Sequence, residues 1–285
     1  MIEALYYVKK EDKRVLCTLC PHGCRIEPGE YGFCMARKNI GGVLYSENYG
    51  KISSLALDPI EKKPFNRFMP GSYVLSFGMF GCNMNCPFCQ NYRISRTRPP
   101  VETMTAEDIV QIAENTKSRG NIGVAYTYNE PLIGYEFVLD CCKKVKESGM
   151  KNILVSNGFL SSKPLEELIP YVDAANIDLK CYDQKTYKDT IGGELKVVKN
   201  TVKKMFQAGV HVEVTMLIVP DVNDRPEEFE EATEFLAELS CEIPLHISRY
   251  FPARMYDKPP TDIRLMDRLK KIAERRLRYV YLGNV

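Results

Sequence analysis

From about residue 70 onward, short runs rich in β-branched residues alternate with longer amphipathic stretches. The short runs predict β-strands, which we place at Tyr73–Phe77, Gly123–Tyr128, Asn152–Asn157, Ala174–Lys180, Val210–Val219 and Leu245–Phe251. The amphipathic stretches predict helices at Thr105–Arg119, Tyr135–Ser148, Leu165–Tyr171, Leu195–Ala208 and Pro226–Leu239. Strands and helices that alternate in this way form a parallel sheet. The pattern therefore predicts an α/β fold in which six βα units curl into most of a barrel.

Local signals mark the ends of several of these helices. Thr105 is followed three residues later by Asp108, which predicts a capping box at the start of the first helix. Gly120, Gly149 and Gly209 follow three of the amphipathic stretches, as glycine commonly does where a helix ends.

Polar residues gather where the predicted strands end. They are Asn129 and Glu130 after the second strand, Ser156 on the third, Asp178 and Lys180 on the fourth, and Arg249 and Tyr250 on the sixth. In a βα barrel, the carboxyl ends of the strands build the active site. We therefore expect these side chains to lie around one site.

A three-cysteine motif follows the first predicted strand. Cys82, Cys86 and Cys89 have the spacing C-x₃-C-x₂-C, and Phe88 directly precedes the last of them. Three thiolates on a short loop suit an iron–sulfur cluster, and a [4Fe–4S] cube would keep one iron free for a substrate or cofactor. No further cysteine follows before Cys141. A structural zinc site is the alternative, because short cysteine spacings also bind zinc.

This motif resembles the signature of the radical S-adenosylmethionine (SAM) superfamily. The resemblance covers about residues 71–255 and implies a partial (βα)₆ barrel of the TIM type. It also implies that Cys82, Cys86 and Cys89 hold a [4Fe–4S] cluster whose open iron chelates SAM. The reduced cluster would then split SAM into methionine and a 5′-deoxyadenosyl radical, which abstracts hydrogen from a substrate or a partner protein.

The same resemblance implies which residues contact SAM. Glu130 matches the acidic position of the family's "GGE" element, although Tyr128 and Asn129 stand where two glycines are usual. A solvated loop carboxylate is the alternative for Glu130. Asp178-Leu179-Lys180 is similar to a run in the glycyl-radical-enzyme activases, in which the lysine neutralises the SAM carboxylate. Asp178 would bind a monovalent cation or orient SAM; the alternative is a simple ion pair between Asp178 and Lys180.

Three further residues complete the expected set of SAM contacts, namely Phe88, Asn129 and Ser156. In the activases an Asp-Thr-Asn-Gly run ends the third strand, and here Val155 stands in place of its acid. Among the three histidines, His211 is expected to be structural, and His246 could point toward the interior of the barrel.

A second group of cysteines lies near the start of the chain. Cys17, Cys20, Cys24 and Cys34, together with His22, fit zinc or a second iron–sulfur cluster. The alternative is that the four cysteines are reduced and pack as small hydrophobic residues. We divide the chain into a Cys-rich N-terminal segment at 1–70, the barrel at 71–255, and a C-terminal helix and strand at 256–285.

The N-terminal group narrows the resemblance to the radical SAM member of the AmmeMemoRadiSam system. The runs that carry it are Cys20-Pro21-His22, Gly81-Cys82-Asn83, Cys86-Pro87-Phe88-Cys89-Gln90-Asn91-Tyr92, Thr127-Tyr128-Asn129-Glu130-Pro131 and Tyr279-Val280-Tyr281-Leu282-Gly283-Asn284-Val285. This family's partners are a dioxygenase-like protein and a small companion protein. The substrate does not follow from the resemblance. Similarity to pyruvate formate-lyase activating enzymes makes a glycyl-radical activase the second hypothesis, and a non-catalytic iron–sulfur or zinc scaffold is the third.

Composition limits the partners. The formal net charge of +2 does not favour nucleic acid. No apolar run is long enough to cross a bilayer and no secretory signal is present, so we expect a cytoplasmic protein without membrane contact. Eleven cysteines in such a chain favour metal ligation over disulfides. We expect an external electron donor and a protein partner or substrate.

Overall fold

The computed structural model describes residues 1–285 and is built around one eight-stranded sheet. Its spatial order is β16-β15-β14-β13-β12-β11-β9-β8. The strands are β8 (Ser54–Pro59), β9 (Tyr73–Gly78), β11 (Asn121–Tyr126), β12 (Lys151–Ser156), β13 (Ala174–Asp178), β14 (His211–Ile218), β15 (Leu245–Arg249) and β16 (Val280–Gly283). All neighbours pair in parallel except β8, which is antiparallel to β9. The six predicted strands are confirmed as β9, β11, β12, β13, β14 and β15, and the α/β fold class is confirmed with them.

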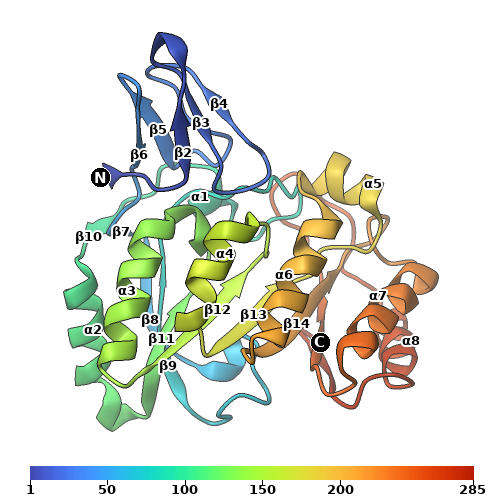
Figure 1. The fold of residues 1–285 in the computed structure, drawn as a ribbon. Helices are drawn as coiled ribbons and strands as arrows, with labels where there is room; N and C mark the ends of the chain where they lie inside the picture. Colours follow the sequence, from blue (N-terminus) through green and yellow to red (C-terminus); the bar gives the residue numbers. More distant parts are fainter.

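Helices cover the outer face of this sheet (Figure 1). The longer ones are α2 (Ala106–Asn115), α3 (Tyr135–Glu147), α4 (Ser162–Leu168), α6 (Leu195–Gln207), α7 (Pro226–Leu239) and α8 (Ile263–Ala273). Two short helices, α1 (Tyr92–Ser95) and α5 (Gln184–Thr186), and a π-helical turn at Tyr187–Ile191 lie in the connections. The 3₁₀ turns are Glu11–Lys13, Ile60–Lys62, Lys117–Arg119, Pro131–Gly134 and Ile169–Tyr171. None of the helices is long and apolar enough to pass through a bilayer.

The capping box predicted at the start of α2 is confirmed. The Asp108 backbone N–H donates to Thr105 Oγ1 over 3.1 Å, and the Thr105 N–H donates to Asp108 Oδ2 over 2.8 Å. Two N–H groups that the helix itself cannot satisfy therefore have partners, as the sequence pattern requires.

The two faces of the sheet carry different side chains. Successive strand residues point to opposite faces, so Leu75 and Val124 face the large core beneath the helices, and their neighbours Val74 and Ala125 face inward. The inner apolar group also contains Ile60, Phe65, Ile153 and Ala174. The segment around Ile60 and Phe65, which precedes β9, thus packs against the inner face near the amino ends of the strands.

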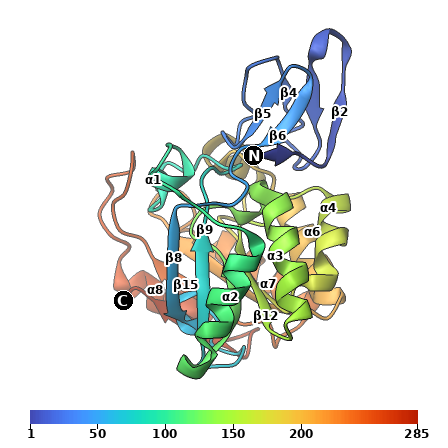
Figure 2. The ribbon, with the colours of Figure 1, turned by 90° about the vertical axis from the view of Figure 1, so that its left-hand side faces the viewer.

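The chain before this sheet forms a small β unit, the N-terminal unit, which lies above the carboxyl ends of the strands (Figures 1 and 2). Two three-stranded sheets, β1-β6-β5 and β2-β3-β4, make it up. Their strands are β1 (Ile2–Glu3), β2 (Tyr7–Lys9), β3 (Val15–Cys17), β4 (Arg25–Ile26), β5 (Arg37–Ile40) and β6 (Val43–Ser46). A short ladder of β7 (Lys51–Ile52) and β10 (Glu102–Thr103) follows.

Segment 1–70 does not end where this small unit ends. Strand β8 lies within that segment but joins the edge of the main sheet, where it pairs with β9. The division of the chain at residues 70 and 255 stays a prediction.

Candidate active site

The loop that holds Cys82, Cys86 and Cys89, the cluster loop, follows the carboxyl end of β9, and neighbouring residues fix its position. Asn129 holds its first turn: Asn129 Oδ1 accepts the Met79 N–H over 3.1 Å, and Asn129 Nδ2 donates to the Gly81 carbonyl over 2.9 Å. Gly81 has φ +93°, and a Cβ there would lie 2.6 Å from the Cys34 carbonyl oxygen. Only glycine fits this close approach between the loop and the N-terminal unit.

The sulfurs of this loop lie in a partly enclosed setting. Cys86 is buried, and Cys82 Sγ accepts the Met84 N–H over 3.3 Å and lies 3.8 Å from Asn157 Nδ2. Burial raises the pKa of the Cys82 thiol, and it raises the pKa of Cys86 to about 11 although the Lys180 charge opposes this. Thiols of this kind ionise when a metal replaces the proton.

The donor set suits a multi-iron cluster. No three Cys, His, Asp or Glu side chains converge closely enough to enclose a single metal ion. In a [4Fe–4S] cluster each thiolate binds a different iron, so the sulfurs need not meet at one point. Three soft ligands on one loop, with two N–H donors at the Cys82 sulfur, therefore fit such a cluster better than they fit a lone zinc ion.

Arg254, which the sequence did not single out, clamps the cluster loop from the connection between β15 and α8. Its Nη1 donates to the carbonyls of Cys86 and Asn85 over 2.7 and 3.2 Å, and Nη2 donates to Asn85 Oδ1 over 2.8 Å. The next residue, Met255, donates its N–H to the Pro87 carbonyl over 3.1 Å. No local pattern marks Arg254, because its partners lie far away in the sequence.

Glu130 is buried beside this loop, so the alternative of a solvated carboxylate does not hold. Its Oε1 accepts the Leu132 N–H over 3.0 Å and the Ser156 hydroxyl over 2.8 Å, and its Oε2 accepts the Asn157 N–H over 2.8 Å. Burial raises the pKa of Glu130 to about 7, against the effect of these three donors. A carboxylate can accept about four hydrogen bonds, which leaves capacity for one more donor on Oε2.

Ser156 and Asn157 therefore serve Glu130 directly. Asn157 also links that carboxylate to the cluster loop, because its Nδ2 donates to Asn83 Oδ1 over 2.9 Å. The sequence placed Asn157 next to Ser156 but did not assign it a role. Its position in the run Val155-Ser156-Asn157-Gly158 was the signal that could have found it.

Asp178 and Lys180 form an ion pair at the end of β13. Lys180 Nζ lies 2.7 Å from Asp178 Oδ2, and both side chains are partly exposed. Burial alone would lower the pKa of Lys180, but the Asp178 charge outweighs it and raises that pKa. The simple pairing considered from sequence is thus present, and the electrostatic influence of Lys180 on Cys86 places the pair near the cluster loop.

The remaining predicted residues lie at the edge of this group. Phe88 is buried, and its ring contacts Tyr256 edge-on with centroids 6.2 Å apart. Arg249 Nε donates to the Thr261 carbonyl over 2.8 Å, and the Tyr250 hydroxyl donates to the Tyr256 carbonyl over 2.6 Å. Arg249 and Tyr250 therefore hold the connection that carries Arg254.

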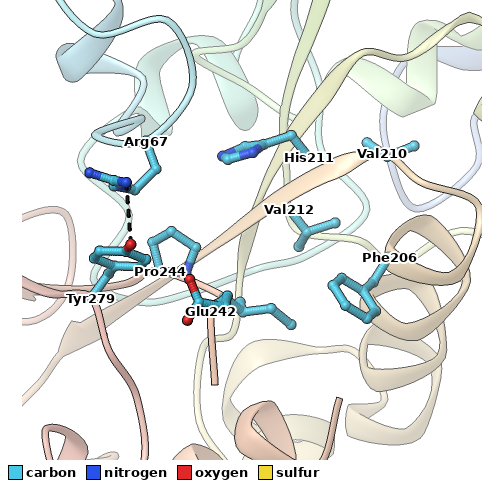
Figure 3. Close-up of a pocket in the computed structure, with 9 residues that line it drawn as sticks. Arg67, Phe206, Val210, His211, Val212, Glu242, Pro244 and Tyr279 are labelled. Carbon is cyan, nitrogen blue, oxygen red and sulfur yellow. Dashed lines mark hydrogen bonds between the residues drawn. The ribbon is translucent and has the colours of Figure 1, made fainter. Parts of the chain in front are cut away.

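A separate pocket of about 290 Å³ lies at the amino ends of β14 and β15, where Arg67, His211 and Tyr279 line it (Figure 3). His211 and His246 both contact the buried Glu213, at 3.0 and 2.6 Å. Burial would raise the pKa of Glu213, but these histidines and the Arg67 N–H lower it to about 2. This end of a barrel ordinarily carries stability, not catalysis.

A parallel sheet with a three-cysteine loop and buried acceptors at its carboxyl end is the arrangement of an enzyme built around an iron–sulfur cofactor. The family model described as the radical SAM superfamily matches residues 77–236, and the chain belongs to that superfamily. Members of the superfamily are enzymes, and membership implies a [4Fe–4S] cluster and SAM.

Several relatives give the range of this similarity. An uncharacterized protein of Methanocaldococcus jannaschii is 43% identical over the whole of this chain and 86% of its own length. The pyruvate formate-lyase-activating enzyme of Clostridium pasteurianum is 26% identical over 66% of this chain and 80% of its own. The structure of Streptococcus suis SuiB bound to its precursor peptide SuiA has a TM-score of 0.57 at 18% identity. That match covers 72% of this chain and 46% of SuiB, and it shows the fold alone.

Proposed function

We propose that this protein cleaves SAM reductively and uses the resulting radical to abstract hydrogen from a substrate or partner protein. The observation that carries the proposal is the junction of two groups at one end of the sheet. Cys82, Cys86 and Cys89 leave β9 there, and Asn157 joins their loop to the buried Glu130. When bound and reduced by an external donor, the cluster supplies the electron that splits SAM.

The chain's own residues would bind and orient SAM. Glu130 has acceptor capacity for the SAM ammonium, and Ser156 and Asn157 fix its orientation. Lys180 would neutralise the SAM carboxylate, with Asp178 holding the lysine in place or binding a monovalent cation. Phe88 and Asn129 would support this arrangement through the cluster loop.

A protein or peptide is the substrate class we favour. The activating enzymes among the relatives, and the peptide-bound SuiB of the same fold, support that choice. Within this class we propose the radical SAM member of the AmmeMemoRadiSam system, on the N-terminal cysteine runs. A glycyl-radical activase is the second candidate, because it would share the Asp178–Lys180 pair. The cytoplasmic location stays a prediction.

Turnover of SAM tests the proposal. After anaerobic reconstitution with iron and sulfide, the protein should form 5′-deoxyadenosine and methionine when a strong reductant is added. Cys86→Ala should abolish that turnover, and Cys241→Ala, which changes an exposed cysteine, should retain it.

A protein that assembles the cluster but never turns over SAM would instead be a scaffold, and the proposal would fail. Wild-type turnover in Cys86→Ala would remove the assignment of the cluster ligands.

A further inference from the structure

Four cysteines of the N-terminal unit lie together outside the site described above. Cys17 ends β3, Cys20 and Cys24 lie in the turn between β3 and β4, and Cys34 precedes β5. The Cys17 N–H donates to the Cys24 carbonyl over 3.0 Å, which closes the turn. All four are free thiols, two of them buried and two partly buried.

A backbone N–H group points at one of these sulfurs. The Phe33 N–H donates to Cys24 Sγ over 3.4 Å. The Met84 N–H makes the same type of bond, from two residues ahead, to Cys82 in the cluster loop. A neutral thiol is a weak acceptor, and such donors chiefly stabilise a thiolate.

A buried cation lies beside the same group. Arg37 is 1% exposed, and its Nη1 lies 3.9 Å from Cys17 Sγ. Arg37 also pairs with the buried Glu136, yet its Nε and Glu136 Oε2 have no partner. Glu136 balances the charge of Arg37, and Nη1 of the guanidinium stays close enough to donate to a ligand sulfur at Cys17.

The backbone of the unit is strained beside one of the cysteines. Met35, directly after Cys34, has φ +61°, a left-handed conformation that residues with a side chain rarely adopt. Gly23, directly before Cys24, has φ +53°, which glycine adopts without strain. Strained turns of this kind persist where surrounding contacts fix them, and they cluster at ligand sites.

The unit has few buried apolar residues. Apart from cysteines they are Ala4, Val15, Leu19, Ile26, Ala36 and Leu44. All of these except Ala36 join the same apolar cluster as the main sheet and its helices.

We propose that Cys17, Cys20, Cys24 and Cys34 bind a thiolate-liganded metal centre, either a zinc ion or a second iron–sulfur cluster. A zinc ion would require the cysteine side chains to turn inward, because their sulfurs do not enclose one point. The cluster loop shares that property, and its thiolates are expected to bind separate irons. The proposal goes beyond SAM cleavage and does not depend on it.

The metal centre would also stabilise the cluster loop. The Cys82 N–H donates to the Cys34 carbonyl over 3.2 Å, and His22 Nε2 contacts the Asn83 carbonyl oxygen at 2.7 Å. These two contacts come from residues within or directly beside the four-cysteine group. Metal bound there would therefore fix one wall of the cluster loop.

Metal analysis of the full chain tests the proposal in a background without the radical cluster. The variant Cys82→Ala/Cys86→Ala/Cys89→Ala, purified anaerobically, should hold about one zinc, or about four irons with visible absorbance, per chain. Adding Cys20→Ser or Cys34→Ser should reduce that content to the level of the variant with all four N-terminal cysteines replaced. Adding Cys241→Ser, at an exposed position, should leave it unchanged.

Two results would overturn the proposal. One is a triple variant that holds no metal even after incubation with Zn²⁺ and after reconstitution with iron and sulfide. The other is full metal content in the variants with Cys20→Ser or Cys34→Ser. Because neither measurement involves SAM, a failure here is distinguishable from a failure of the proposed enzymatic function.

Cysteine labelling of the wild-type chain keeps the proposal testable if these variants do not fold. Iodoacetamide labelling at each cysteine is read by mass spectrometry before and after metal removal with a chelator. The four N-terminal cysteines should become reactive only after removal, and Cys241 should react equally in both. Equal labelling of the four before and after removal would contradict the proposal.

Discussion

At the scale of single residues, Glu130 is the residue with the most specific predicted role. It is buried and three donors fix its orientation. One of these donors comes from Asn157, which also donates to Asn83 in the cluster loop. Burial raises its pKa to about 7 although these three donors oppose the shift. An ammonium group at Oε2 would add a fourth donor and a positive charge.

Glu130→Gln should weaken SAM binding by about 1.5–3 kcal/mol, the usual range for hydrogen bonds to charged groups. That corresponds to roughly 10- to 150-fold in the dissociation constant, measured by calorimetry on reconstituted protein. Iron content should not change. Glu231→Gln, on the exposed side of α7, serves as the matched control. Unaltered SAM affinity in Glu130→Gln would show that the ammonium binds elsewhere.

Arg254 is the second residue whose role can be measured. Arg254→Ala removes the three hydrogen bonds that Arg254 donates to the cluster loop. The loop should therefore hold its cluster less tightly, and the iron content after reconstitution should be lower. Arg254→Lys should recover part of the loss, because an ammonium cannot reproduce the planar fork of donors. The exposed Arg264→Ala is the control. Iron content equal to wild type in Arg254→Ala would make the clamp incidental.

At the scale of elements, the start of α2 offers a clean test of local design. Thr105→Ala removes one half of the capping box, and the free energy of unfolding should fall by about 1 kcal/mol. Urea denaturation followed by circular dichroism measures this. Thr103→Ala, at an exposed strand position two residues earlier, should have little effect. Equal stability of the two variants would rule out a contribution from the cap.

The elements themselves were largely predictable, for a physical reason. Strands such as Ala174–Asp178 and helices such as Leu195–Gln207 have hydrophobic periods that are local in the sequence. Strand β8 was not predicted, because it pairs antiparallel with β9 at the sheet edge and is not part of the alternating strands and helices.

The residues of the candidate site likewise fall into those that the sequence could predict and those that it could not. Cys82 and its two partners were found from their spacing, whereas Arg254 acts on a loop that is distant in the sequence. Asn157 lay inside a run already considered, but its link between Glu130 and Asn83 exists only in the folded chain.

At the scale of the whole molecule, we expect Glu213, near the amino ends of β14 and β15, to make the stability depend on acid. Glu213 lies on the inner face, binds His211 and His246, and accepts the N–H groups of Asn66 and Arg67. It therefore ties β14 and β15 to the segment that packs beneath the barrel.

The pKa of Glu213 is lowered from its usual value of 4.5 to about 2. Its contribution to stability is therefore present above pH 4.5 and is lost as the pH falls toward 2, on the order of 3 kcal/mol in total. Thermal unfolding between pH 6 and pH 2.5 should show this loss in the wild type and a flatter profile in Glu213→Gln. Glu231→Gln should follow the wild type. Parallel profiles for Glu213→Gln and wild type would exclude Glu213 as the source.

The clamp on the cluster loop also bears on how the protein is made. The loop contacts Cys34, synthesised before it, and Arg254, which follows Asn85 by 169 residues. At about 5–20 residues per second, roughly 10 to 30 s pass between translation of the loop and translation of its last clamp. During that interval the three cysteines of the loop lack the hydrogen bonds from Arg254. A cluster delivered to the nascent chain would therefore bind a loop that Arg254 does not yet hold, unlike the loop of the finished protein.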